Sequence, residues 1–172
     1  MADTPWMRIK APGARLLLQS DAPARAAATE VWGVAFSEES CRARTSGDRA
    51  TLWLGPDEYL LWQARRQPEL PIDALEQALR SHPHSLVDVS HRQIALGIEG
   101  PHATTILAGA CPLDLNLEQF PVGMCTRTVL AKAEMILWRI GAEEFHVEIW
   151  RSFQNYTVEL LQEIGREFSG PL

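Results

Sequence analysis

Histidine is the residue type in this chain best suited to metal binding or proton transfer, and the densest group is His82 and His84 with His91 nearby. In a strand, His82 and His84 would lie on one face, as a pair of metal ligands must. No cysteine or carboxylate follows at the spacing of a structural zinc site, so we expect a solvated loop here rather than a metal centre. We expect His102, just inside a predicted helix start, and His146, on the polar face of a predicted strand, to be surface residues.

The sequence contains few signals of nucleophilic catalysis. Ser90 and His91 are adjacent, but adjacency does not establish hydrogen-bonding geometry, and no G-x-S-x-G elbow is present. Cys41, Cys111 and Cys125 are an odd number without C-x-x-C spacing, which predicts reduced thiols that are buried or half-buried. They would be nucleophiles only in an electropositive microenvironment. Neither G-x-G-x-x-G nor the Walker pattern occurs. We therefore predict no catalytic, cofactor-binding or metal-binding residue on this chain.

Two charged residues interrupt or end apolar strands and therefore need a partner or solvent. Asp88 lies within the apolar run Leu86-Val87-Asp88-Val89. A charge in such a strand must be paired or face water, so Asp88 is expected to accept a hydrogen bond from the backbone of the following turn, with a ligand role as the alternative. Arg151 lies between an apolar strand and the last helix, where it could pair with a partner's carboxylate or cover apolar surface with its stem.

The elements that must position these residues are organised around two similar stretches, LWLGPDEYLLW (Leu52–Trp62) and LWRIGAEEFHVEIW (Leu137–Trp150). In the first, Gly55-Pro56-Asp57 has the residues of a tight turn between two strands, so each stretch predicts a β-hairpin. Each hairpin is followed by a helix-like segment. We interpret the chain as an N-terminal arm (1–13) and one domain (14–172) made of two related halves, about 14–83 and 84–170. The predicted class is α+β, a mostly antiparallel sheet with helices packed on it.

Helices are predicted from capping residues and from apolar spacing. Ser20 or Asp21 can cap a helix that Gly33 ends. Ser152 is the predicted cap of the last helix. The apolar stripe of that helix is expected to consist of Phe153, Tyr156, Leu160, Ile164 and Phe168.

Composition excludes several classes of partner. The chain has 172 residues, 16 Lys and Arg against 22 Asp and Glu, and a formal net charge of −6. It therefore lacks the basic surface that nucleic acid or an anionic membrane would require, and we expect neither as a partner. No segment approaches the roughly 20 apolar residues that span a bilayer, and the N-terminus lacks an apolar stretch of secretory length. We expect a cytoplasmic protein.

Four segments in order resemble the gamma subunit family of heterotetrameric sarcosine oxidase. The segments are LWLGPDEYLLW (52–62), VDVSHRQIALGIEGPHATTILAGACPLDL (87–115), FPVGMCTRT (120–128) and WRSFQNYTVELL (150–161). The resemblance covers about residues 14–168. The middle segment is also similar to the folate-binding fold of the glycine-cleavage T-protein, in which a D-V-S strand end precedes a strand, a G-P turn and a helix.

This resemblance implies a non-catalytic subunit that helps to assemble a flavoenzyme, which oxidatively demethylates sarcosine to glycine. The implied partners are the alpha, beta and delta subunits, and the implied cofactors FAD, FMN, NAD and tetrahydrofolate would be held by those subunits, with none on this chain. The alternative is a free-standing folate-dependent, aminomethyltransferase-like protein with Asp88 and Asp114 as polar anchors around a pteridine. Against it, the T-protein pattern has a longer Gly-rich acidic loop between the strands near Leu130 and Ile136, and its N-D context is replaced here by Pro112-Leu113-Asp114.

Overall fold

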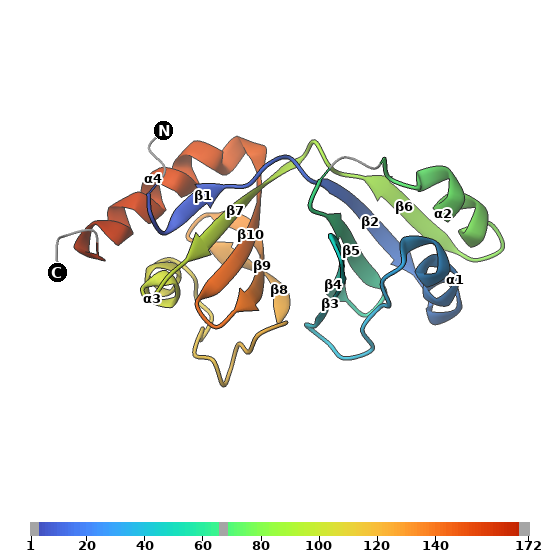
Figure 1. Cartoon of the computed structure of the whole chain (residues 1–172), viewed down its shortest axis with the longest axis horizontal. Helices are drawn as coiled ribbons and strands as arrows, with labels where there is room; N and C mark the ends of the chain where they lie inside the picture. The colour runs from blue at the N-terminus through green and yellow to red at the C-terminus, as the bar shows by residue number, and fades with distance from the viewer. Residues whose placement is uncertain (1–3, 66–68, 169–172) are drawn as a thin grey trace. The chain divides into compact units, whose positions relative to one another are not determined.

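Two five-stranded sheets form the framework of the computed structural model, which describes residues 4–65 and 69–168. One unit comprises residues 11–91, and the other comprises residues 1–10 together with 92–172 (Figure 1). Residues 1–3 of the predicted arm, 66–68 of the predicted first half and 169–172 at the end of the predicted domain lie outside the described residues. No helix in the described ranges is long and apolar enough to cross a membrane.

The unit of residues 11–91 contains a sheet in the order β3-β4-β5-β2-β6, with every neighbouring pair antiparallel. Its elements are β2 (Ala14–Ser20), α1 (Ala22–Trp32), β3 (Ala43–Ser46), β4 (Arg49–Gly55), β5 (Glu58–Gln63), α2 (Ile72–Leu79) and β6 (His84–Asp88). The capping prediction for α1 is confirmed, because the Asp21 carboxylate accepts from the Ala24 N–H at 2.9 Å and Gly33 ends the helix with a left-handed φ of 79°.

The second unit contains a sheet in the order β1-β7-β10-β9-β8, again antiparallel throughout. Its elements are β1 (Met7–Ile9), β7 (Gln93–Glu99), α3 (Ala103–Ala108), β8 (Cys125–Leu130), β9 (Ala133–Gly141), β10 (Glu144–Trp150), the 3₁₀ turn η1 (Arg151–Phe153), α4 (Gln154–Gly165) and the 3₁₀ turn η2 (Arg166–Phe168). Both predicted hairpins are present, as β4–β5 and β9–β10 (Figure 1).

The two sheets have equivalent strand orders. In each, the second strand of the hairpin pairs with an inner strand, β2 or β7, and one further strand forms the edge beyond it. In the unit of residues 11–91 that edge strand is β6, which follows α2. In the other unit the corresponding edge is β1, from the N-terminal end of the chain. The fold is therefore α+β with helices packed on antiparallel sheets, as predicted.

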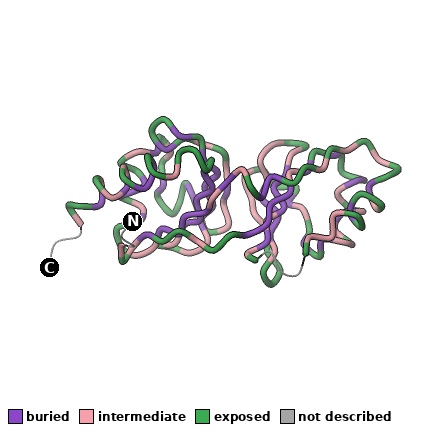
Figure 2. The backbone as a smooth tube through the Cα atoms, turned by 90° about the horizontal axis from the view of Figure 1, so that it is seen from above, coloured by how far each residue is buried: buried purple, intermediate pink, exposed green. Residues whose placement is uncertain are grey.

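Each unit has its own apolar core between its sheet and its helices. In Figure 2 the buried stretches, in purple, recur along the strands. The core of residues 11–91 centres on Trp32 of α1, with leucines of β2 and α2 packed around it. The core of the other unit includes Phe145, Val147 and Ile149 of β10, which face α3 and α4. The alternation predicted for β10 thus identified the correct core-facing residues.

The buried face of α4 differs from the predicted stripe. The helix buries Thr157, Val158, Leu161 and Gly165. Of the predicted stripe, Ile164 and Phe168 are half-buried and pack against the core, Leu160 is half-buried, and Phe153 and Tyr156 are exposed. The predicted stripe was anchored on Phe153, which belongs to the 3₁₀ turn before the helix and so does not continue its period. Ser152 lies in the same turn and does not cap α4, which has no side-chain capping bond.

Candidate functional site

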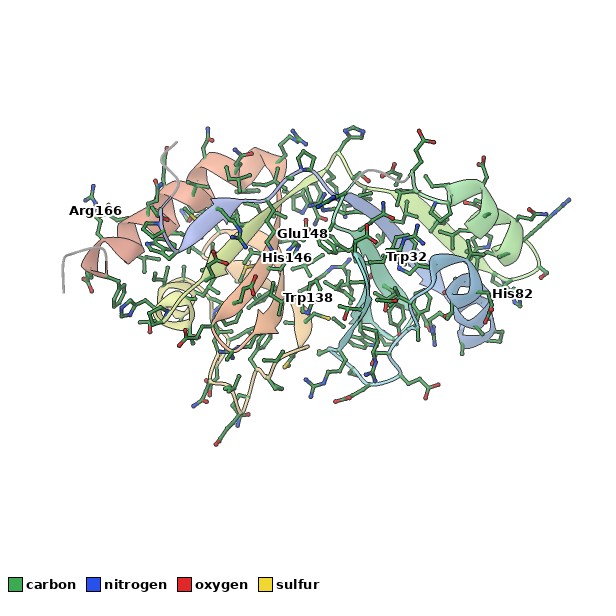
Figure 3. The ribbon with its side chains drawn as sticks, in the orientation of Figure 1. Trp32, His82, Trp138, His146, Glu148 and Arg166 are labelled. Carbon is green, nitrogen blue, oxygen red and sulfur yellow. The ribbon has the colours of Figure 1, made fainter. Side chains whose placement is uncertain are left out.

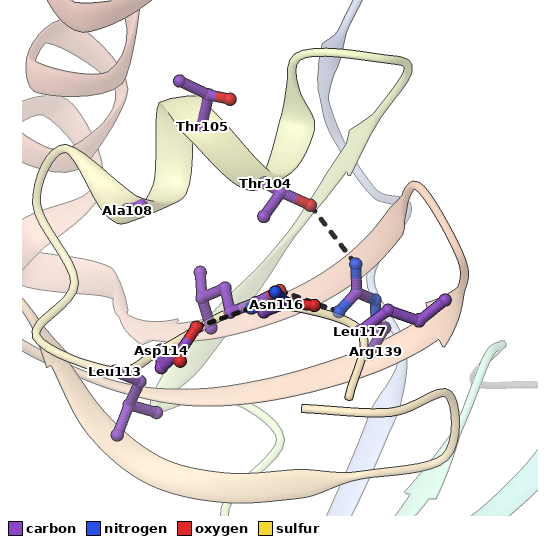
Figure 4. Close-up of a pocket in the computed structure, with 9 residues that line it drawn as sticks. Thr104, Thr105, Ala108, Leu113, Asp114, Asn116, Leu117 and Arg139 are labelled. Carbon is purple, nitrogen blue, oxygen red and sulfur yellow. Dashed lines mark hydrogen bonds between the residues drawn. The ribbon is translucent and has the colours of Figure 1, made fainter. Parts of the chain in front are cut away.

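A pocket of about 540 Å³ lies beside α3, where the connection from α3 to β8 passes over β9 (Figure 4). We name the connection, residues 109–124, the α3–β8 loop. The pocket is lined by residues of α3, of this loop and of β9: Thr104, Thr105, Ala108, Leu113, Asp114, Leu115, Asn116, Leu117 and Arg139. Its lining combines aliphatic side chains with two hydroxyls, one carboxylate, one carboxamide and one guanidinium.

Arg139 of β9 is the residue that organises this pocket. Its side chain is buried, with 3% exposure, and its guanidinium lies 4.6 Å from the centre of the Phe145 ring. Burial lowers the pKa of Arg139 from its usual value, because desolvation disfavours the charged form. The sequence alone did not predict this role for Arg139. The signal was available, because Arg139 interrupts the apolar run Met135–Ile140 much as Asp88 interrupts its own strand.

Every N–H of the Arg139 guanidinium donates to an uncharged acceptor. Nε and Nη2 donate to the carbonyl oxygen of Ala142 at 3.2 and 2.7 Å. The other acceptors are the carbonyl oxygens of Leu115 and Phe120, at 2.9 and 2.7 Å from Nη1, and the Thr104 hydroxyl, at 3.2 Å from Nη2. An arginine has five N–H donors, so a ligand in the pocket could bind this guanidinium only by displacing one of these bonds. Arg139 therefore holds the loop in place rather than offering a free anion site.

The α3–β8 loop is also ordered by its own polar residues. The Asp114 carboxylate accepts from the Asn116 N–H at 2.9 Å, and the Asn116 side-chain oxygen accepts from the Glu118 N–H at 3.3 Å. The Asn116 carbonyl accepts from the N–H groups of Gln119 and Phe120 at 3.1 and 2.8 Å. These are turns closed by Asp and Asn side chains. Asp114 is exposed, and its role in this structure is to shape the turn.

A buried imidazole–carboxylate pair lies on β10. His146 Nε2 is 2.6 Å from Glu148 Oε1, the two side chains are 1% and 0% exposed, and the Trp138 ring lies 5.7 Å from the imidazole (Figure 3). The prediction that His146 is a surface residue on a wet strand face is therefore wrong. Alternation correctly placed His146 and Glu148 opposite the helix-facing core. However, side chains of neighbouring strands also cover this second face, and Trp138, the residue of β9 paired with His146, packs against the imidazole.

The other histidines are placed as follows. His84 begins β6 rather than lying in a loop: its Nδ1 is 2.9 Å from the His82 carbonyl and its Nε2 is 3.0 Å from the Glu76 carboxylate of α2. These bonds, the one with His82 first, raise the pKa of His84. His102 is exposed, as predicted, and stacks on Phe168. In residues 4–65 and 69–168, no three His, Cys, Asp or Glu side chains are grouped to hold a metal ion.

The turn after β6 confirms the prediction for Asp88. Its carboxylate accepts from the Ser90 N–H at 2.8 Å. The Ser90 hydroxyl is itself buried and accepts from the Arg15 N–H at 2.9 Å, which gives it a structural role at the start of β2. The cysteines are free thiols, with Cys111 and Cys125 buried and Cys41 half-buried, as predicted.

Comparison with known proteins decides the family. A family model described as the sarcosine oxidase gamma subunit family matches residues 19–167. The chain belongs to this family. The gamma subunit of sarcosine oxidase from Corynebacterium sp. strain U-96 is 39% identical over 120 residues, which cover 70% of this chain and 58% of that relative's length. The gamma subunit from Arthrobacter sp. is 34% identical over 122 residues, covering 71% of this chain and 59% of its own length.

Solved structures agree with the family assignment. A chain of the heterotetrameric sarcosine oxidase from Corynebacterium sp. U-96 superposes with a TM-score of 0.87 and 31% identity, covering 96% of this chain and 86% of that one. The glycine-cleavage aminomethyltransferase T of Bartonella henselae superposes with a TM-score of 0.68 and 10% identity, covering 90% of this chain and 44% of that one. The second match shows a shared fold, as the sequence resemblance implied.

These comparisons favour membership of the sarcosine oxidase gamma subunit family over a free-standing aminomethyltransferase. The two carboxylates of that alternative, Asp88 and Asp114, lie in different units, and each has an oxygen engaged in its own turn. The strands near Leu130 and Ile136 are joined by the two-residue turn Ala131-Lys132. Arg151 is exposed, and its N–H donates to the Arg92 carbonyl at 3.0 Å.

Proposed function

We propose that this chain is the non-catalytic gamma subunit of a heterotetrameric sarcosine oxidase and acts by assembling the flavoenzyme that oxidatively demethylates sarcosine to glycine. The observation that carries the proposal is the agreement between the family match over residues 19–167 and the superposition on a chain of a heterotetrameric sarcosine oxidase over 96% of this chain. A likeness that extends through both units supports a shared role as well as a shared fold.

Four side chains with potential chemistry have structural partners in this chain, which supports an assembly role. The Arg139 donors are used to hold the α3–β8 loop, and the Ser90 hydroxyl accepts from the Arg15 backbone. Asp88 and Asp114 each close a turn. In our proposal, the alpha, beta and delta subunits hold FAD, FMN, NAD and tetrahydrofolate, and the reaction takes place on them in the cytoplasm. The free thiols of all three cysteines fit a reducing compartment.

Co-expression tests this proposal. The alpha, beta and delta subunits of the same organism's complex are produced with and without this chain, and complexes are purified through a tag on the alpha subunit. We expect this chain to co-purify stoichiometrically. Its omission should reduce the yield of assembled flavoprotein and of sarcosine-dependent peroxide release in the same proportion. Complexes of full yield and activity without this chain would overturn the assembly role.

The absence of catalysis on this chain is tested on the purified subunit by itself. Calorimetric titration with tetrahydrofolate should give no saturable heat, and the protein should release no peroxide with sarcosine. Saturable folate binding would contradict the proposal, and Asp88→Asn and Asp114→Asn variants would then show which unit is responsible. Asparagine keeps the oxygen that closes each turn while removing the charge, so both variants should fold normally.

A further inference from the structure

The α3–β8 loop exposes apolar side chains beside a pocket. Leu117 and Val122 are 47% and 50% exposed, and Leu113 lies half-buried at the pocket with Leu117 (Figure 4). Single exposed aliphatic residues are common on protein surfaces. Here they lie within one connection of sixteen residues that has no helix or strand, and ordered connections longer than about 12–15 residues usually have a function.

Hydrogen bonds within this chain hold the α3–β8 loop in one conformation. Arg139 binds the carbonyls of Leu115 and Phe120, on either side of Leu117. The Asp114 and Asn116 turns fix the backbone between them. A rigid loop loses little conformational entropy on binding, which favours association. The bonds made by Arg139 thus present Leu117 in one position next to the pocket.

The charge of the loop indicates the chemistry of what it binds. Residues 109–124 contain two carboxylates, Asp114 and Glu118, and no lysine or arginine. Both carboxylates are exposed and lie on either side of Leu117 in the sequence. A partner surface that covers Leu117 would therefore gain from basic residues around an apolar centre.

We infer that the α3–β8 loop is the docking site for a larger subunit of the proposed complex, and that the partner inserts an apolar side chain, flanked by Lys or Arg, into the pocket beside Leu113 and Leu117. This inference rests on the proposed function. The pocket volume of about 540 Å³ leaves room for a large side chain. The aliphatic contacts supply apolar burial, and the carboxylates supply orientation and a faster encounter.

The aromatic residues at the end of β10 form the competing surface. Trp150, Phe153 and Tyr156 are exposed there. The Arg92 guanidinium already lies 4.9 Å from the centre of the Trp150 ring, and Phe153 and Tyr156 pack edge to face at 6.4 Å. Their ring faces are thus partly occupied within this chain, whereas Leu117 lines an open pocket. The open pocket therefore favours the α3–β8 loop over this aromatic surface as the docking site.

Competition between two tagged copies tests this inference. Wild-type chain with one tag and a variant with another are co-expressed with the alpha, beta and delta subunits, and the ratio of the two in the purified complex is measured by mass spectrometry. Leu117→Glu/Val122→Glu should reduce the variant's share about tenfold or more, as expected for losing the centre of an interface. The matched control is Val87→Glu/Val129→Glu, which alters exposed valines on two edge strands and should keep an equal share.

A second variant separates charge from apolar contact. Asp114→Asn/Glu118→Gln removes both carboxylates, and the amide oxygen of the introduced asparagine can still close the turn. Its share should fall several-fold at low ionic strength and recover at high salt, because exposed charges are screened. Thermal unfolding of each purified variant identifies any that fails to fold, and in that case the charge variant and Leu117→Ser carry the test.

The outcomes are distinguishable. Equal incorporation of the Leu117→Glu/Val122→Glu variant, or loss of a Phe153→Ser/Tyr156→Ser variant while the loop variant is retained, would overturn the docking site and leave the assembly role intact. If wild-type chain does not enter the complex at all, the proposed function fails and the inference fails with it. Loss of the loop variants together with normal incorporation of the valine control would establish the loop as the docking surface.

Discussion

The two units hold the connection after their first helix in different ways. In residues 11–91 this connection runs between α1 and β3. The Arg49 guanidinium of β4 donates to the Trp32 carbonyl at the end of α1 at 2.9 Å. Within the connection, the Ala35 and Ser37 carbonyls accept from the neutral hydroxyls of Thr51 and Tyr59, each at 2.7 Å. In the other unit, the α3–β8 loop is held by the guanidinium of Arg139. The donors come from equivalent hairpins in both cases, Thr51 and Tyr59 from β4–β5 and Arg139 from β9.

This difference shows what a longer loop requires of its sheet. A hydroxyl has one donor, so it can satisfy one carbonyl. A guanidinium reaches several acceptors in a fixed plane, and Arg139 bridges Leu115, Phe120 and Ala142 at once. The disadvantage is a buried charge whose desolvation must be offset by those bonds. The unit with the longer connection thus uses the stronger but less replaceable tether.

Replacing Arg139 should have the largest effect on stability. Arg139→Met keeps much of the side-chain volume and leaves the carbonyls of Leu115, Phe120 and Ala142 without their donor. We expect the free energy of unfolding to fall by about 3–5 kcal/mol, because two buried carbonyls and two part-buried acceptors lose their partner at once. Urea unfolding measures it, with Thr51→Val as the control in the other unit, which should cost about 1–2 kcal/mol. Equal losses in the two variants would contradict the distinction between the tethers.

The helices that follow the two hairpins bury different kinds of residue. In residues 11–91, α2 buries Leu75 and Leu79. In the other unit, α4 buries Gly165, where an added Cβ would overlap the indole of Trp6 just before β1. Gly165→Ala should therefore lower the free energy of unfolding by about 2–3 kcal/mol, since a rigid ring must move.

A double variant sharpens this expectation. With Trp6→Ala in place, the space opposite Gly165 is open. Gly165→Ala should then be neutral or stabilising by about 1 kcal/mol, because alanine is the better helix former. Thermal unfolding of the four proteins of this cycle measures the coupling. Additive effects would show that Trp6 does not limit the size of residue 165.

Local signals in the sequence predicted most elements, and the failures arise where distant segments meet. Asp21 and Gly33 predicted the two ends of α1, and Gly55-Pro56-Asp57 predicted the turn of the β4–β5 hairpin. Both predictions were possible because capping and turn chemistry depend on neighbouring residues. The predicted face of α4 omitted Gly165, which carries no apolar signal and is covered by Trp6 from far along the chain.

In the candidate site, too, roles that depend on neighbouring residues were predictable and roles that depend on distant segments were not. The turn role of Asp88 depended on residues next to it and was predicted correctly. The burial of His146 depends on side chains of neighbouring strands, such as Trp138 of β9, which alternation along one strand does not reveal. Arg139 binds Leu115 and Phe120, more than fifteen residues away in the sequence. Its apolar context indicated that it needed partners, but their identity depended on the fold.

A smaller effect is expected for the neutral tether on β5. Tyr59→Phe removes the hydroxyl that donates to the Ser37 carbonyl and leaves the ring packed edge to face on Phe36 at 5.0 Å. The free energy of unfolding should fall by about 1–2 kcal/mol, the cost of one buried acceptor without a donor. Chemical denaturation measures it. A loss as large as that of Arg139→Met would show that one hydroxyl holds its connection as firmly as the guanidinium does.

The edge strands give the smallest effect, and it depends on pH. Strand β6 is joined to α2 by His84 and Glu76, whereas β1 is joined to β7 by the exposed pair Arg8 and Glu99 at 3.0 Å. The pKa of His84 is raised in the folded state, so its contribution is fully present below the unfolded pKa and is lost as pH rises through the folded value. Wild-type protein should therefore be more stable than His84→Gln near about pH 5.5 and equal to it near about pH 8.5. Thermal midpoints across this range measure the difference.

Arg8→Gln is the control, because arginine stays charged throughout and the stability difference between this variant and wild type should not change with pH. A His84→Gln difference that also stays constant would show that β6 is held by the neutral imidazole and its backbone bond alone.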